Sequence, residues 1–405
     1  MAVAEIRPGT TASLASAART RIPLFALFSL LALYTLSTLD GGEIPARIIS
    51  AVFLLFAAGF LIVSRHQRLT LGLPTVCLFF MAAYGIVQTL WFPQKIVYNG
   101  WTGTLFWFTA AIITLLSTQL LQNPLSAARF RSLLVAFGGA ICALELLERA
   151  SGTNRYYWLI PSRYPAVFGP FAYWNNFAAF VELVLPVTLW LGLGGRKLAM
   201  PYVLLSALEI GAVISSGSRA GTALVIVEFL AVVVIACVRE RSRKLAYAAA
   251  AAILLSAVFV WAAGFDTVVA KLEKSDQLAV RRAINASSFA MIRDRPLTGW
   301  GVGTYVPVYP MFATYDDGSW VNHAHNDWLE WTAEGGIFFS GLMLVLFVWS
   351  IRPALRSGWG IGVLAICLHA LVDYPFARLG VCAWYFAMIG MLNAQIEWSG
   401  GRRSK

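Results

Sequence analysis

Charged side chains are scarce in this sequence. They make up 13% of its 405 residues, whereas hydrophobic side chains make up 59%. A water-soluble domain contains about 25% charged residues. The scarcity therefore excludes a soluble globule and predicts an all-α polytopic membrane protein.

Motifs typical of several other protein classes are also missing. The five cysteines lie in apolar runs without CxxC spacing, which favours neither a disulfide framework nor a metal site. No GxxxxGK[ST] sequence for binding nucleotide phosphates occurs. The first apolar run, 22–39, has no small-residue cleavage site before Asp40, so we expect a retained membrane span and no cleaved signal peptide.

Long apolar runs are what the sequence has instead. Windows of about 17–23 residues predict about twelve transmembrane helices, near 22–39, 46–63, 72–91, 104–121, 131–148, 171–193, 200–216, 221–237, 245–262, 331–350, 358–372 and 379–396. The longest interval between apolar runs covers residues 263–330, which are called the polar segment below. We expect three parts: spans one to nine within 1–262, the polar segment, and spans ten to twelve with a tail within 331–405.

The basic residues predict how the spans are oriented. Short loops on one side carry 18 Lys and Arg residues, and those on the other side carry 7. Because basic residues gather in cytoplasmic loops, both termini are expected in the cytoplasm and the polar segment on the periplasmic face of a bacterial inner membrane. The net charge of +11 lies mostly in these loops, which favours membrane lipids over nucleic acid as partners. An enzyme on this face needs a donor already carried across, typically a lipid-linked one.

A polar cluster, Asn322–Glu330, closes the polar segment and contains His323 and His325. Its beginning resembles the HxHxDH signature of metallo-hydrolases, but Trp328 replaces the last histidine, so no metal is expected. A serine hydrolase needs G-x-S-x-G, and Arg219 occupies the central position of Gly217–Gly221. A third interpretation is that a helix N-terminus near His325 favours anions and keeps the imidazole neutral, as a base.

Three arginines share the expected outer face with His325. Arg219 lies between spans seven and eight, and Arg281 and Arg282 lie in the polar segment. Such a cationic site with one base suits a diphosphate leaving group and an acceptor hydroxyl. Simpler interpretations stay open: His325 as a helix cap, Arg219 reaching lipid headgroups, and Arg281 and Arg282 as a solvated helix face.

Four elements, in this order, resemble the O-antigen ligase and O-antigen polymerase superfamily of membrane glycosyltransferases. They are GPF…NxFA at 169–178, SRxG at 218–221, R-x14-PLxGxG at 281–301, and HNDxL…ExG at 325–336; a DYP at 373–375 is also similar. The resemblance covers roughly 165–395. It implies a GT-C-like fold and a metal-independent, inverting transfer of a glycan from undecaprenyl diphosphate, with no cofactor.

The resemblance also implies roles for particular residues. His325 would activate the acceptor hydroxyl, and Arg219 and Arg281 would hold the diphosphate. The residues expected to bind substrate are Asn175, Arg282, His323, Asn326, Glu334 and Asp373. The preferred acceptor is lipid A–core, and polymerisation onto a growing glycan is the near alternative.

Two departures and one other class of function are noted. Phe339 fills the last position of the ligase pattern, and Tyr173 with Asn175 stands where the family has paired asparagines. Glu182 is expected to contact the donor site or a neighbouring helix. Glu209 and Glu228 lie inside predicted spans, where they also fit a proton relay in a transporter of lipid-linked glycans. Against a transporter, the two halves show no inverted repeat.

Overall fold

The structure is a computed structural model, and it describes residues 9–39, 43–64, 69–91, 96–162, 167–193, 200–240, 253–254, 257–258, 277–314, 318 and 320–401. The statements below concern these residues. Most of the predicted ninth span, 245–262, and residues 263–276 of the polar segment lie outside them.

Helices dominate the described chain. They are α1 (Gly9–Leu36), α2 (Glu43–Val63), α3 (Leu73–Trp91), α4 (Val97–Leu120), α5 (Pro124–Ser151), α6 (Trp174–Leu193), α7 (Met200–Ser216), α8 (Arg219–Glu240), α11 (Gln277–Asp294), α12 (Tyr305–Val308), α13 (Asp327–Ser357), α14 (Ile361–His369) and α15 (Leu379–Gly401). Two 3-10 turns, η2 (Tyr309–Met311) and η3 (Pro375–Ala377), and an antiparallel pair, β1 (Arg155–Tyr156) and β2 (Ile160–Pro161), complete the described elements.

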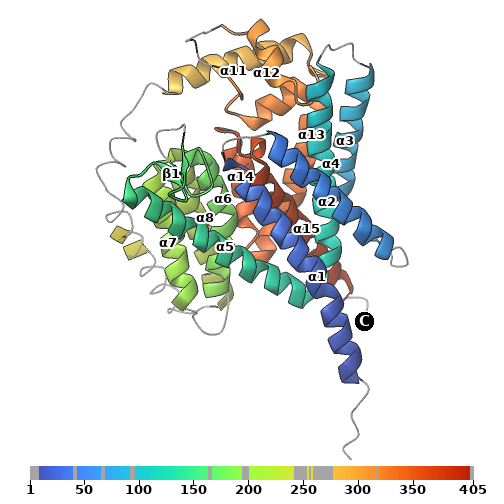
Figure 1. Cartoon of the computed structure of the whole chain (residues 1–405), viewed down its shortest axis with the longest axis vertical. Helices are drawn as coiled ribbons and strands as arrows, with labels where there is room; N and C mark the ends of the chain where they lie inside the picture. Colours follow the sequence, from blue (N-terminus) through green and yellow to red (C-terminus); the bar gives the residue numbers. More distant parts are fainter. Residues whose placement is uncertain are drawn as a thin grey trace, which may run out of the picture.

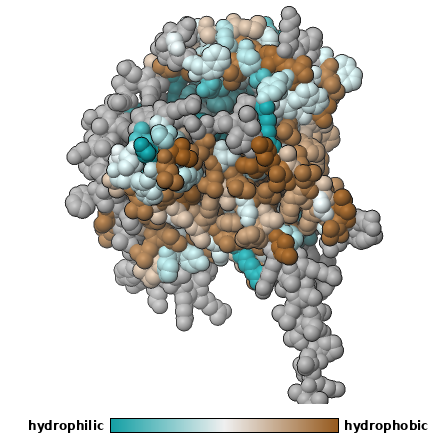
Figure 2. Space-filling model, viewed as in Figure 1, coloured by the Kyte–Doolittle hydropathy of each residue, from teal (hydrophilic) through white to brown (hydrophobic). Residues whose placement is uncertain are grey.

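Eight of these helices are long and apolar enough to cross a membrane, namely α2–α6, α8, α13 and α15. Two shorter apolar helices accompany them. One is the part Ile22–Leu36 of α1, and the other is α7. Large apolar side chains stay exposed on the outside of the bundle, for example Leu55 and Ile62 on α2 and Val227 and Val234 on α8. Figure 2 shows this brown surface around the helices. The fold is that of an all-α polytopic membrane protein, as predicted.

One predicted span is much shorter in the structure. The window at 358–372 contains α14, which has nine residues and ends at His369. Nine residues span about 14 Å, roughly half the hydrocarbon thickness of a bilayer. The chain then turns through 370–374 into η3, where Pro375 lies at the first position of the turn. The end of α14 therefore places a polar turn beside the bundle interior.

The described part of the polar segment covers one end of the bundle, called the capped end (Figure 1). Helices α11 and α12 lie there, and α1 begins near the opposite end. Two helices form the buried middle of the bundle: 89% of the apolar window of α6 and 83% of that of α15 are buried. Hydrophilic side chains gather in a hollow beneath α11 and α12 (Figure 2). The site is therefore sought at the capped end.

Candidate functional site

Asp373 is the centre of a polar cluster at the capped end. Its carboxylate is 1% exposed and forms an ion pair with Arg281 of α11, with Nη2 and Oδ2 3.1 Å apart. Arg281 also donates to the Val372 carbonyl at 2.8 Å and to the Tyr173 hydroxyl at 3.1 Å. The half-buried Arg281 and the buried Asp373 thereby join the polar segment to the turn after α14.

Asn175 joins the same carboxylate to a third segment. Its Nδ2 donates to Asp373 and to the Tyr173 hydroxyl, the latter at 3.0 Å. Its Oδ1 accepts from Ser218 Oγ, at 2.6 Å, just before α8. Both residues are buried. The first turns of α6 and α8 are therefore fixed relative to Asp373.

Close packing of α6 on α8 explains the small residues in two of the sequence motifs. A β-carbon at Gly221 would overlap Ala178 and lie 2.9 Å from Ser218 Oγ. Ser218 Oγ also accepts from the Gly221 backbone N–H at 3.1 Å, so the serine caps α8. The NxFA motif in α6 and the SRxG motif at the start of α8 thus pack against each other.

His325 faces the other oxygen of Asp373. Its Nδ1 lies 3.7 Å from Asp373 Oδ1, within ion-pair range and beyond hydrogen-bond length. No other partner reaches this buried nitrogen among the described residues. The backbone of His325 is left-handed, with φ of 52°, a conformation rare for a residue with a β-carbon. The ring meets Tyr374 edge-on at 4.8 Å.

The charges of the cluster shift the pKa of its members. Burial alone raises the pKa of Asp373, but His325 and Arg281 outweigh it and hold the pKa below its ordinary value. Burial lowers the pKa of Arg281, and the nearby Asp373 and Tyr173 reverse this to a net increase. Burial, with Asp373 next, raises the pKa of Tyr173. Asp373 and Arg281 are therefore ionised at neutral pH, and Tyr173 keeps its proton.

The residues after His325 hold α13 against the turn that carries Asp373. Asn326 caps α13 by accepting from the Leu329 N–H at 3.1 Å, and it donates to the Leu371 carbonyl at 2.8 Å. Asp327 is buried and accepts from the Phe376 N–H at 2.9 Å. These bonds interlock the HND and DYP motifs and keep His325 near Asp373. As predicted, a helix begins close to His325, two residues further on.

A kink in α13 interlocks the two remaining motifs. Gly336 has φ 67° and ψ −171°, which only glycine adopts easily. The carbonyls exposed by the kink accept from the PLTGWG stretch, Ala333 from Trp300 at 2.9 Å and Glu334 from Gly301 at 2.7 Å. In return, the Ile337 N–H donates to the Pro296 carbonyl at 2.9 Å. The glycine run therefore pairs with the kink.

Gln88 of α3 is a residue that sequence reasoning missed. This buried amide donates to the Thr298 and Glu334 carbonyls at 2.6 and 3.1 Å, and it accepts from the Val302 N–H at 3.2 Å. It links α3 to the polar segment and to the kink. Its only sequence signal is an isolated amide within an apolar helix.

The remaining predicted site residues are not all in the Asp373 cluster. Arg219 is the exposed first residue of α8, and Arg282 is exposed on α11. His323 stacks on Tyr374 at 4.6 Å and contacts Glu330 Oε1 at 3.0 Å through Nδ1. Glu334 accepts from the Tyr305 N–H at 2.8 Å. His323 and His325 thus lie against one tyrosine ring and contact different carboxylates.

Outside the Asp373 cluster, Glu182 forms an unexpected pair with His369. Glu182 Oε1 and His369 Nδ1 are 2.7 Å apart, and both side chains are fully buried. Glu182 therefore makes a helix contact, between α6 and α14, which was one of the two expectations for it. Glu209 accepts from Thr188 at 2.8 Å and joins α7 to α6. In the described part of the chain, no group of three His, Cys, Asp or Glu residues is arranged to hold a metal ion.

The fold and the cluster define a multi-pass membrane protein with a polar site at one end of its helices. Residues 202–346 match the family model described as O-antigen ligase. The match contains Arg219, Arg281 and His325 and supports the predicted resemblance to the O-antigen ligase and O-antigen polymerase superfamily. Proteins of this family are glycosyltransferase-like ligases or polymerases, so the match supports an enzyme in general. The search of curated proteins found no match to the chain.

Proposed function

We propose that the protein transfers a preassembled glycan from undecaprenyl diphosphate to a lipid A–core acceptor, on the periplasmic face of the bacterial inner membrane. The observation that supports this most is the placement of His325, with Nδ1 3.7 Å from the buried Asp373 carboxylate. A carboxylate beside one imidazole nitrogen orients the ring and stabilises its protonated form. The other nitrogen, Nε2, then serves as the base.

The proposed step transfers one proton to His325 and one electron pair to the leaving diphosphate. The acceptor oxygen attacks the anomeric carbon from the face opposite the diphosphate, and its proton passes to His325 Nε2. The bond between the anomeric carbon and the diphosphate oxygen breaks, and undecaprenyl diphosphate leaves with the electron pair. The configuration at the anomeric carbon is inverted. Neither a metal ion nor a cofactor takes part in this step.

The arginines have two different roles in this proposal. Arg219 and Arg282 are exposed at the ends of segments that bond to the Asp373 cluster, and they hold the diphosphate. Arg281 already makes three hydrogen bonds to Val372, Tyr173 and Asp373. It adds positive charge for the leaving group and keeps Asp373 in place. Arginine suits both tasks because its planar group has five donors.

The remaining predicted residues divide between the proposed donor and acceptor sides. Asn175 and Asp373 form the wall of the site next to the arginines, and His323, Asn326 and Glu334 lie on the α13 side. The polar segment brings site residues from 263–330 over the spans of 1–262 and 331–405. The basic loops support cytoplasmic termini and, with them, a periplasmic position for this site.

The test is transfer by the purified protein in chelator, with undecaprenyl-diphosphate oligosaccharide as donor. With lipid A–core, we expect one discrete increase in the mass of the acceptor and none without it. A ladder of products without lipid A–core would identify a polymerase instead. Donor left intact in both reactions, while the same donor is transported by protein in vesicles, would favour a transporter and overturn the proposal.

A further inference from the structure

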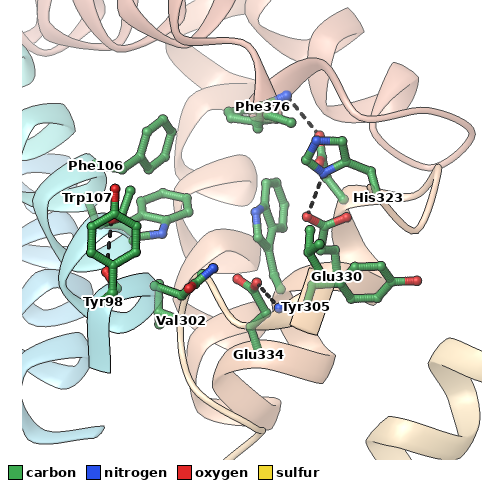
Figure 3. Close-up of a pocket in the computed structure, with 17 residues that line it drawn as sticks. Tyr98, Phe106, Trp107, Val302, Tyr305, His323, Glu330, Glu334 and Phe376 are labelled. Atoms are coloured by element: carbon green, nitrogen blue, oxygen red, sulfur yellow. Dashed lines mark hydrogen bonds and ion pairs between the residues drawn. The ribbon is translucent and has the colours of Figure 1, made fainter. Parts of the chain in front are cut away.

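A cavity of about 260 Å³ lies beside the Asp373 cluster. It is bounded by α4, the stretch 302–306 of the polar segment, the first turns of α13, and η3 (Figure 3). Pockets for drug-sized ligands measure about 300–1,000 Å³. This cavity is therefore suited to a single ring with its substituents.

Aromatic rings form part of the cavity wall. Trp107 of α4 lies edge-on to Trp331 of α13, with ring centroids 6.3 Å apart, and Trp331 packs on Phe376 at 5.0 Å. Tyr98 lies at the edge of the cavity and is 60% exposed. Such rings offer flat apolar faces and partly positive edges. They favour a flat ligand with C–H groups on its faces.

Carboxylates form the opposite wall, where Figure 3 shows Glu330 and Glu334 near His323 and Tyr305. Glu334 Oε1 accepts from the Tyr305 N–H at 2.8 Å, and Glu330 accepts from the Ala324 N–H at 2.8 Å. A carboxyl group has further acceptor positions on its two oxygens, so both side chains retain capacity for ligand hydroxyls. No Lys or Arg is among the described residues that line the cavity. Arg47 lies beyond the lining, against the Tyr98 ring and bonded to Thr102, so an anionic ligand inside the cavity would face Glu330 and Glu334 without a lining cation.

The cavity and the proposed base are separated by a single tyrosine ring. His323, which lines the cavity, stacks on Tyr374 with centroids 4.6 Å apart, and His325 meets the same ring at 4.8 Å. Arg281 and Asp373 lie on the His325 side. Positive charge for a diphosphate and acceptor oxygens for hydroxyls are thus in adjacent, distinct places.

We propose that this cavity binds an uncharged sugar ring of the acceptor, stacked on the aromatic wall and donating its hydroxyls to Glu330 and Glu334. Because Tyr374 lies between this cavity and His325, the bound ring is not the reacting one, and a neighbouring sugar of the acceptor carries the attacking hydroxyl. The acceptor source rests on the proposed function, whereas the preference for a neutral sugar rests on the cavity alone.

The first experiment measures binding without transfer. The purified full chain in lipid nanodiscs is studied by saturation-transfer NMR with methyl β-glucopyranoside and with its anionic counterpart, methyl β-glucuronide. We expect the neutral glycoside to bind better, and Tyr98→Ala to weaken it roughly five- to tenfold, as for the loss of one stacked ring. Glu330→Gln should reduce the discrimination against the glucuronide. Trp101→Ala is the matched control, since Trp101 is an exposed ring on the same helix and does not line the cavity.

Other results would contradict the proposal. Binding that Tyr98→Ala leaves unchanged, a glucuronide that binds as well as the glucoside, or no binding of either sugar would each overturn it. The second experiment compares KM values at saturating co-substrate: Tyr98→Ala should raise the KM for lipid A–core and leave the KM for the donor unchanged. A rise in the donor KM alone would refute the assignment to the acceptor. Wild-type protein that binds the glucoside but transfers no glycan would contradict the proposed function and leave the sugar site standing.

Discussion

Arg281 of α11 and Asp373 of the turn after α14 form an ion pair of 3.1 Å although 92 residues separate them in the sequence. The carboxylate is buried, and the guanidinium is 23% exposed. The pair connects the polar segment to the last part of the helix bundle. Its loss should therefore affect the stability of the whole capped end.

Arg281→Ala should lower the free energy of unfolding by about 3 kcal/mol, because it leaves a buried carboxylate without its cation. The neighbouring Arg282 is exposed, so Arg282→Ala should change stability by less than about 0.5 kcal/mol. Thermal unfolding of the purified variants in one detergent compares the two. Equal losses in both variants would show that the ion pair has no special role.

The stability that Asp373 contributes should depend on pH in a defined direction. Its pKa in the folded protein lies below the ordinary value of 3.8, so its contribution is present above that value and is lost as pH falls through the folded pKa. The difference in Tm between wild type and Asp373→Asn should stay constant from pH 7 to about 4.5 and narrow only below about 3.9. For the half-exposed Asp294, Asp294→Asn should show almost no difference. A gap for Asp373→Asn that narrows between pH 7 and 5 would contradict the lowered pKa.

His325→Ala should reduce the rate of glycan transfer by about 10²- to 10⁴-fold, the usual contribution of a general base. Donor binding should change little, since the arginines remain. His323→Ala removes a histidine two residues away that lines the cavity, and it should mainly raise the acceptor KM. Steady-state kinetics with lipid A–core separates these effects. A larger loss of kcat in His323→Ala than in His325→Ala would reverse the assignment of the base.

Gly336→Ala should destabilise the protein by at least about 1–3 kcal/mol, because φ of 67° with ψ of −171° is strained for alanine. In addition, the new β-carbon would overlap the Leu297 carbonyl. Gly341 is the control on the same helix, with no atom near its β-carbon position. Gly341→Ala should be neutral or stabilising by up to about 1 kcal/mol. Thermal unfolding of the two variants compares the cost of a β-carbon at the kink with that of a β-carbon elsewhere on α13.

Gln88→Ala should loosen the stretch 296–302, because it leaves the Val302 N–H without its acceptor and the Thr298 carbonyl with the Tyr84 hydroxyl as its remaining donor. A buried N–H without a partner costs about 1–3 kcal/mol. Hydrogen exchange should become faster there. As a control, Gln122 bonds Thr70, so Gln122→Ala should leave this stretch unchanged. Protection of 296–302 that is the same in Gln88→Ala and wild type would show that the amide is dispensable.

The helices were predictable because apolar length alone defines a membrane span. The motifs also indicated which residues matter, since His325, Arg281 and Asp373 all lie in them. What the sequence did not reveal was how motifs pair: NxFA with SRxG, PLTGWG with the kink, and HND with DYP. Those pairings depend on contacts between residues more than 30 positions apart, such as Asn175 with Ser218, and no local pattern encodes them.

Two other features escaped prediction for physical reasons of their own. The predicted span at 358–372 is apolar except for His369, so hydropathy could not distinguish a nine-residue helix from a full span. The pair between Glu182 and His369 joins two groups that each look unfavourable inside a membrane. Only the packing of α14 on α6 brings Glu182 Oε1 and His369 Nδ1 together.

Asp373 has consequences for the order in which the protein matures. Its neighbours Asn175, Arg281 and His325 are all synthesised before it, and chains fold from the N-terminus during synthesis. A nascent chain that stops short of residue 373 lacks the carboxylate that unites these segments. The turn is then fixed by η3 and α15, which follow it. The proposed catalytic geometry consequently forms only after the other segments of the cluster have been made.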